Sequence, residues 1–325
     1  MTHREILEAL PRKSALIVGD ICLDRWSTYD PSEAEPSRET GIPRIAVVKT
    51  ELTPGAGGTV ANNAKALGFG RVVVLGAAGT DGFGFELKKA LARGGIESAL
   101  VESSEISTFT YTKLTNMTTG QEDLPRVDFI RTTDLPESVE AAVLEQLNRL
   151  APEFDAIFVS DQAETASGGV VNRAVRDTLA SLALQRPTQI IWVDSRNRPQ
   201  HFRNVRVKVN RDESACFPAE IHIFRNEANL PLLCITYGSE GALLVSATGE
   251  QFVSATPIEN PVDICGAGDS FSVGAVAALV AGATPAEAAG MGNRVASITV
   301  MKHGTGTASP DEVLEIGGKD QQLFG

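Results

Sequence analysis

The chain is 325 residues long and acidic: 29 Lys and Arg residues stand against 41 Asp and Glu residues, which gives a formal net charge of −12. A protein that tracks a nucleic-acid backbone needs a broad basic face, so this balance argues against polymeric nucleic acid as the main partner. Hydrophobic residues make up 42% of the chain, which is enough for a large buried core and excludes general disorder.

No targeting or membrane segment is predicted. The apolar run 15–18 has no cleavage-site pattern after it, and the longest uncharged stretch, 270–286, is interrupted by glycine and proline. We therefore expect a cytoplasmic protein with no membrane partner. The four cysteines form no C-x-x-C pair, which disfavours a zinc site or a disulfide framework and predicts buried reduced thiols at Cys22, Cys216, Cys234 and Cys265.

Short apolar runs rich in β-branched residues recur along the chain and predict buried strands, and the stretches between them predict helices. This alternation indicates the α/β class, with a doubly wound, mostly parallel sheet flanked by helices. The predicted strands are 14–18, 71–75, 156–160, 189–194, 205–209 and 232–236, and the predicted helices are 60–67, 85–93, 137–150 and 170–184.

Other segments break this alternation. Residues 44–49, 106–116 and 124–131 predict short exposed strands of a small separate sheet, and residues 242–246 and 251–255 predict a hairpin. Helices follow the hairpin. Two of them begin with a capping box, in which a hydroxyl residue precedes proline and a glutamate follows at the third helical position: Thr284-Pro285-Ala286-Glu287 and Ser309-Pro310-Asp311-Glu312.

One glycine-rich turn predicts chemistry. The segment Asp263-Ile264-Cys265-Gly266-Ala267-Gly268-Asp269 lies directly before an apolar helix over 270–281. Small residues let successive backbone N–H groups face one point, and a helix N-terminus adds positive potential, so the turn predicts an anion site. Asp269 could accept a proton from an attacking hydroxyl while the N–H groups stabilise a transferred phosphoryl group. The alternative is an ordinary turn with an aspartate at a helix N-terminus.

This turn resembles the carboxy-terminal signature of the ribokinase-like, or PfkB-type, carbohydrate kinases. Further segments resemble other landmarks of that family in the right order, from about residue 14 to about residue 315. The resemblance implies a ribokinase-like fold with a small β-sheet lid. The matching segments are Val18 to Trp26, Pro54 to Gly68, Gly79 to Gly84, Asn210-Arg211-Asp212-Glu213 and Thr236-Tyr237-Gly238-Ser239-Glu240-Gly241.

The resemblance also implies an activity and an organisation. It implies transfer of the γ-phosphoryl group of ATP to a sugar hydroxyl with Mg²⁺, and it leaves open a monovalent cation. It implies a core of residues 1–25, 51–105 and 132–325, and a lid of residues 26–50 and 106–131 through which two copies are expected to pair. It assigns Asp269, Gly266, Ala267 and Gly268 to catalysis; Asp20, Asp24, Gly55, Thr59 and Asn63 to the sugar; Asn210, Glu213, Thr236, Gly238, Gly241 and Asn293 to the nucleotide; and Glu213 and Asp263 to the metal.

Within the family, the chain is most similar to the kinases that phosphorylate heptose 7-phosphate in ADP-heptose synthesis, through residues 19–25, Thr112-Lys113 and Arg126-Val127-Asp128 among others. Lys113 and Arg126 are either ligands of a substrate phosphate or solvated surface charges. The chain also departs from the pattern: Thr59 replaces a sugar-binding Asn, Cys265 replaces a Thr, the 214–231 segment is short, and Gln162-Ala163-Glu164-Thr165 replaces Tyr-Gly-Lys-Gly.

These departures keep two alternatives open. The first is the same chemistry on another acceptor, such as a nucleoside, a fructose phosphate or a keto sugar acid. The second is a degenerate kinase that acts as a sugar or nucleotide sensor.

Overall fold

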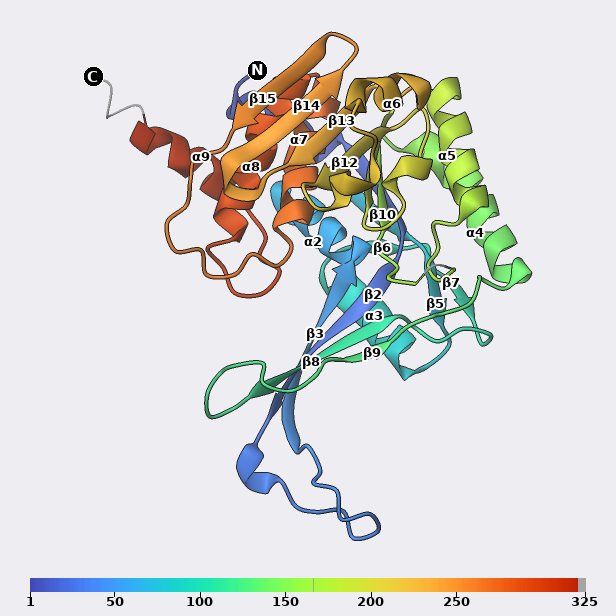
Figure 1. Ribbon diagram of the computed structural model, residues 1–325, viewed down its shortest axis with the longest axis vertical. Helices are drawn as coiled ribbons and strands as arrows, with labels where there is room; N and C mark the ends of the chain where they lie inside the picture. Colours follow the sequence, from blue (N-terminus) through green and yellow to red (C-terminus); the bar gives the residue numbers. More distant parts are fainter. Residues whose placement is uncertain (166, 321–325) are drawn as a thin grey trace.

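The main body of the protein is built on one nine-stranded sheet, in the order β15-β14-β13-β12-β11-β10-β1-β4-β6 (Figure 1). The computed structural model describes residues 1–165 and 167–320. Seven neighbouring strands are parallel, and a hairpin extends the sheet in antiparallel sense. The parallel strands are β1 (Ser14–Gly19), β4 (Arg71–Leu75), β6 (Glu97–Ser98), β10 (Ala156–Asp161), β11 (Ile190–Ser195), β12 (Arg206–Asn210) and β13 (Leu232–Thr236), and the hairpin is β14 (Gly241–Ser246) and β15 (Gly249–Ser254).

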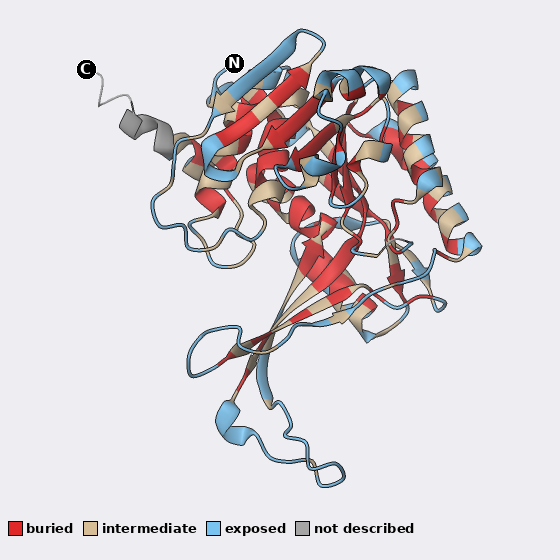
Figure 2. Ribbon diagram, viewed as in Figure 1, coloured by how far each residue is buried: buried red, intermediate tan, exposed pale blue. Residues whose placement is uncertain are grey.

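Helices cover both faces of this sheet and bury its central strands (Figure 2). These strands are apolar on both faces, so both faces need a covering layer. On β1, for example, Leu16 and Ile17 belong to separate hydrophobic clusters on opposite sides of the sheet. The Ile17 cluster is completed by α1 (His3–Ala9), α2 (Gly57–Leu67), α3 (Gly82–Arg93), α7 (Ala267–Ala281), α8 (Pro285–Thr299) and α9 (Pro310–Asp320), and the Leu16 cluster by α4 (Glu137–Leu150), α5 (Arg173–Gln185) and α6 (Ile221–Glu227).

A second sheet of four strands, in the order β3-β2-β8-β9, projects away from the body (Figure 1). We call it the lid sheet. Its strands are β2 (Ile21–Tyr29), β3 (Val47–Ala56), β8 (Thr110–Asn116) and β9 (Val127–Phe129). The expected small separate sheet is therefore present. It also includes residues 21–25 and 51–56, which the sequence analysis placed in the core, because only Asp20 separates β1 from β2 and the chain enters the lid without a loop.

Most predicted elements are confirmed, with shifts that local chemistry explains. The helix predicted over 170–184 begins at Arg173, because the Asn172 side chain accepts a hydrogen bond from the backbone N–H of Val175 and so caps it. The strand predicted from residue 44 begins at Val47. Both capping boxes form, at Thr284 and at Ser309. The short helices α1 and α6 and the two-stranded sheet of β5 (Ala77–Gly79) and β7 (Val101–Ser103) were not predicted.

Two expectations about surfaces can be compared with the structure. Across residues 1–165 and 167–320, no helix combines the length and the apolar character that crossing a membrane requires.

Cys22 and Cys234 are buried free thiols, as predicted, but Cys216 and Cys265 are exposed. That part of the prediction is wrong because both residues lie in surface connections, Cys216 at the end of a 3-10 helix after β12 and Cys265 in the turn before α7.

Candidate active site

The candidate residues gather where the parallel strands of the body sheet end. Asp20 follows β1, Asp161 ends β10 and Asp194 is the penultimate residue of β11, while Asn210 and Thr236 end β12 and β13. In open α/β sheets, ligands bind in the crevice outside the carboxyl ends of the strands. Strand order thus brings together residues that are far apart in the sequence.

The N-terminus of α7 opens onto this edge without a side-chain cap. The helix begins three residues earlier than predicted, with Gly266 as its N-cap in the left-handed conformation at φ 77°. A serine or aspartate cap would occupy the first amides of the helix, whereas glycine leaves them accessible. The Ala267 N–H donates to the Ile264 carbonyl at 3.2 Å. Within the described residues, the amides of Gly268 and Asp269 have no partner.

Asp269 lies in the first turn of α7, next to these amides, and is half-buried. Burial raises the pKa of Asp269 to about 7, the nearby carboxylate of Asp194 raises it too, and Lys208 and Arg196 oppose the rise. A carboxyl group that titrates near neutral pH is suited to accepting a proton from a hydroxyl. The α7 turn therefore combines an anion site with a base.

Lys208 is a candidate that sequence reasoning missed. Its ammonium group donates to Asp194 Oδ2 at 2.8 Å, and the residue is only 4% exposed. Burial lowers the pKa of Lys208, but the surrounding carboxylates, Asp194 above all, raise it further than burial lowers it, so the group stays charged. The available signal was its position: a lysine between two valines in a strand buried on both faces must have a buried partner.

Asp24 lies on β2, close enough to the α7 turn to raise the pKa of Asp269. It shares a face of the lid sheet with Trp26 and Lys113, because residues two apart on a strand and direct partners on the next strand point the same way. A methyl group at Gly55, on the neighbouring strand β3, would lie 2.5 Å from Asp24 Oδ1, so glycine makes room for this carboxylate. Burial raises the pKa of Asp24 to about 6, and Lys113 opposes the rise.

Helix α2 packs against the α7 turn through Thr59 and Asn63. Both are buried, with 2% and 1% exposure. The Thr59 methyl group faces Gly266, since a Cβ there would lie 3.4 Å from Thr59 Cγ2. Asn63 accepts from the Ser270 hydroxyl at 3.1 Å and donates to the Thr59 carbonyl at 3.0 Å. Asn63, expected at the sugar, thus ties α2 to α7 with its amide group enclosed.

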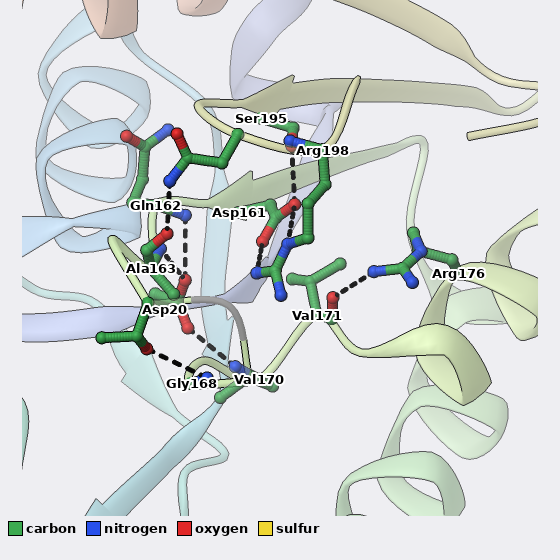
Figure 3. Close-up of polar contacts among 12 residues, drawn as sticks. Asp20, Asp161, Gln162, Ala163, Gly168, Val170, Val171, Arg176, Ser195 and Arg198 are labelled. Carbon is green, nitrogen blue, oxygen red and sulfur yellow. Dashed lines mark hydrogen bonds and ion pairs between the residues drawn. The ribbon is translucent and has the colours of Figure 1, made fainter. Parts of the chain in front are cut away.

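Asp20, also expected at the sugar, holds a loop (Figure 3). One carboxylate oxygen accepts from the N–H groups of Gln162 and Ala163 at 2.8 and 2.9 Å, and the other accepts from Val170 at 2.8 Å. Burial and the neighbouring Asp161 raise the pKa of Asp20 to about 6. Its acceptor capacity is used within the chain, so its geometry is that of a brace for the segment after β10.

Asp161 forms a second buried pair beside this brace. Its carboxylate is bound by the guanidinium of Arg198 and accepts from the Ser195 hydroxyl at 2.6 Å (Figure 3). Asp161 is 1% exposed. Two buried ion pairs, Asp161 with Arg198 and Asp194 with Lys208, therefore stand at the ends of adjacent strands.

The expected nucleotide residues lie past the ends of β12 and β13. Asn210 and Glu213 bond reciprocally: the Asn210 N–H donates to Glu213 Oε2 at 2.7 Å, and the Glu213 N–H donates to Asn210 Oδ1 at 2.8 Å. The Thr236 hydroxyl donates to the Val209 carbonyl at 3.3 Å. Gly241 has φ 126°, and a Cβ there would lie 2.8 Å from the Ala255 nitrogen, so only glycine fits.

Gly238 lies next to open space, whereas the side chain of Asn293 is held by hydrogen bonds within the chain. A Cβ at Gly238 would meet nothing within 4 Å, so this turn borders open space. The Asn293 amide, on α8, donates to the carbonyls of Val253 and Ser254 at 3.4 Å each and so braces β15. Its place is beside the hairpin rather than in the α7 turn.

The two candidate metal ligands are not equivalent. Asp263 accepts from the N–H groups of Cys265 and Gly304 at 2.9 and 3.0 Å, so both its oxygens brace the loop before α7. Glu213 has one oxygen beyond its bond to Asn210, and burial together with Asp194 raises the pKa of Glu213. Across the described residues, no cluster of three or more potential ligands forms a metal site. The hard oxygen of Glu213 fits a water-mediated contact with Mg²⁺ better than Asp263 does.

The lid and the body meet at a group of charges that sequence reasoning did not connect. Glu164 accepts from Arg196 at 2.5 Å and lies 3.9 Å from Arg126, which also binds Asp128 with two nitrogens. Arg126 stacks 4.2 Å from the centre of the Tyr111 ring on β8. Glu164 also lines a cavity of about 40 Å³ under the lid. Arg126 thus has partners within the chain, although its side chain is 38% exposed.

Comparisons with known proteins agree with this geometry. The model of the pfkB family carbohydrate kinases matches residues 14–312. The bifunctional protein HldE of Caulobacter sp. (strain K31) is 30% identical over 330 residues, covering 96% of this chain and 65% of that protein, and HldE of Bradyrhizobium sp. (strain ORS 278) is 28% identical, covering 95% and 64%. The chain therefore spans about two thirds, or slightly less, of these relatives.

Solved structures show the same fold at low identity. Phosphofructokinase-2 from Escherichia coli matches with a TM-score of 0.69 and 18% identity, and ribokinase from Thermotoga maritima with 0.70 and 18%; each comparison covers 94% of this chain and 99% of the other. The body sheet with helices on both faces matches the fold of these structures. The chain is accordingly a member of the pfkB family of carbohydrate kinases, phosphotransferases that act on a sugar hydroxyl.

Proposed function

We propose that this protein transfers the γ-phosphoryl group of ATP to a hydroxyl group of a sugar or sugar phosphate, most like a heptose 7-phosphate 1-kinase. One observation carries the proposal: Asp269 lies beside the uncapped N-terminus of α7. The base and the anion site are therefore within one helical turn of each other, which is what phosphoryl transfer needs.

Each part of the site has a role in this reaction. Asp269 accepts the proton of the acceptor hydroxyl while the hydroxyl oxygen of the acceptor bonds to the γ-phosphorus of ATP. The bond between the γ-phosphorus and the oxygen that bridges it to the β-phosphate breaks, which releases ADP. The amides of Gly268 and Asp269 bind the equatorial oxygens of the transferred group. Asp24 accepts hydrogen bonds from sugar hydroxyls, with Gly55 keeping its place open.

The nucleotide lies, on this proposal, along Asn210, Glu213 and the Gly238 turn. Glu213 would hold Mg²⁺ through water, and the bound ion would neutralise charge on the ATP phosphates. Backbone amides, a helix N-terminus and this ion can bind a nucleotide without a basic surface, which reconciles ATP binding with the net charge of −12.

The lid sheet excludes water from the acceptor side, and we propose that it also pairs two copies of the chain. Support comes from apolar side chains that the strands of the lid sheet leave exposed, including Val47, Val48 and Phe129 at 46%, 55% and 42%. Apolar groups gathered on a projecting sheet commonly mark an interface.

The identity of the acceptor is the part of the proposed function for which the site and the comparisons give the least support. Similarity to HldE proteins supports heptose 7-phosphate. Glu164 favours a second candidate, an acceptor without a phosphate at that end, because its carboxylate stands between Arg126 and Arg196 and would repel a phosphate. The sensor alternative is less well supported, because the base and the open α7 amides are both present.

A panel of acceptors with ADP release as the readout tests the proposal. It should contain heptose 7-phosphate, the free heptose, fructose 6-phosphate, a nucleoside and a keto sugar acid. We expect turnover on at least one sugar, and a loss of several orders of magnitude in Asp269→Asn with ATP still bound. No turnover on any acceptor would refute the kinase proposal, and near-normal turnover of Asp269→Asn would refute the role of Asp269.

A further inference from the structure

Lys208 is a buried charge whose position calls for a functional account. It lies in the middle of β12, whose neighbouring valines, Val207 and Val209, are fully buried. A buried ion pair is weak evidence for stability, because the cost of removing two charges from water often exceeds their attraction. An apolar residue at this point of the strand would be the simpler solution for the fold.

The ammonium group lies directly beneath the α7 turn. A Cβ added to Gly268 would lie 2.8 Å from Lys208 Nζ, so the absence of a side chain at Gly268 lets the charge approach the turn. On its other side the ammonium group binds Asp194 Oδ2 at 2.8 Å. Asp269 follows Gly268 in the same turn and, like Asp194, interacts electrostatically with Lys208. One cation therefore acts on two carboxylates from separate elements, β11 and α7.

We infer that Lys208 is a positioning residue of the phosphoryl-transfer site: it holds the Asp194 carboxylate away from Asp269 and supplies the fixed positive charge that keeps Asp269 in its proton-accepting form. The inference rests on the proposed kinase function. Without the ammonium group, the carboxylates of Asp194 and Asp269 would face each other with no cation beside them. Two carboxylates that share a site in this way do not both ionise, so one of them retains a proton.

The other charges around Asp269 set the background. Arg196, from the segment after β11, acts in the same direction as Lys208, and Asp24, from the lid sheet, acts in the opposite direction. Glu213, next to β12, interacts with Lys208 but is not among the main groups that shift the pKa of Asp269. Lys208 and Asp194 are therefore the pair whose separate removal should have opposite effects.

The test is the pH dependence of kcat/KM for the acceptor identified by the panel, in wild type, Lys208→Met and Asp194→Asn. Lys208→Met should move the acidic midpoint up by about one pH unit or more, and Asp194→Asn should move it down, because charges within a few ångströms shift a pKa by about 1 to 3 units. The titration of ATP itself is common to all variants and cancels in the comparison.

Arg198→Met is the matched control. It breaks a buried ion pair of the same kind at the end of the neighbouring strand, with Asp161, which is not among the main groups that shift the pKa of Asp269. We expect it to lower the melting temperature without moving the midpoint. A lower kcat/KM with an unmoved midpoint in Lys208→Met would overturn the inference and leave a purely structural role.

Folding failure does not leave the inference untested. Circular dichroism melting shows whether Lys208→Met folds, and if it does not, the downward shift in Asp194→Asn decides, since an unmoved midpoint there contradicts the inference. Absence of turnover in the wild type at every pH would instead reject the kinase function, so the two failures are distinguishable.

Discussion

Replacing Gly55 by alanine should disable acceptor binding without disturbing the nucleotide side. The added methyl group would lie 2.5 Å from Asp24 Oδ1, whereas ordinary van der Waals contact begins near 3.4 Å. The backbone of Gly55 is outside the left-handed region, so alanine itself is not strained. The carboxylate must therefore move by about 1 Å, and a misplacement of that size at a reacting centre costs about 100-fold in rate.

We expect kcat/KM for the acceptor to fall about 100-fold in Gly55→Ala, which corresponds to about 2.7 kcal/mol of transition-state stabilisation. The affinity for ATP should stay within about twofold, because Gly55 is on the lid sheet and the nucleotide residues are at the ends of β12 and β13. The measurements are coupled detection of ADP and calorimetric titration of ATP. The melting temperature reports any general effect of overpacking.

Two comparisons separate this contact from other causes. In Gly82→Ala the added methyl group would meet nothing within 4 Å, so wild-type activity is expected. In an Asp24→Ala background, Gly55→Ala should lower kcat/KM for the acceptor little further, because the carboxylate that the added methyl group would contact is no longer there. Full activity of Gly55→Ala, or strict additivity with Asp24→Ala, would refute the argument.

Two further predictions concern stability. The pKa of Asp269 is about 7 in the folded chain against an ordinary 3.8, so between these pH values the native state retains a proton that the unfolded state has lost, and stability falls as pH rises. The melting temperature of Asp269→Asn, measured relative to that of the wild type, should therefore be higher at pH 8 than at pH 5. The same difference between variant and wild type at both pH values would contradict this. Asn63→Ala should lower the free energy of unfolding by about 1 to 3 kcal/mol, because it leaves the buried Ser270 hydroxyl without its acceptor. Urea denaturation measures this, and an unchanged midpoint would disprove the tie between α2 and α7.

Local patterns in the sequence predicted most of the body. Helix α4 has the predicted bounds, Glu137–Leu150, because its apolar period is strong, and both capping boxes form as their residues predict. The chemistry of the α7 turn was also readable, since small residues before an apolar helix have few other uses. These features depend on residues within a few positions of each other.

The site itself depended on contacts between distant segments. Asp20 and Asn63 look like ligands in the sequence, but the loop after β10 and the start of α7 occupy their polar atoms. Lys208 looked like an ordinary lysine in a strand, and only the packing of α7 over β12 places its charge under Gly268. No local pattern contains this information.

The sequence by itself determined the class of the protein: an α/β sheet, a projecting second sheet, and an anion site with an adjacent base in an acidic chain. Periodicity, turn residues and caps act over one or two turns, so they can be read along the chain. Only the tertiary structure decided which polar groups remain open to a ligand and which are bound internally. That distinction is set by strand order and helix packing, because burial and partners from other elements, not residue type, fix the proton affinity and availability of Asp24, Glu213 and Asp269.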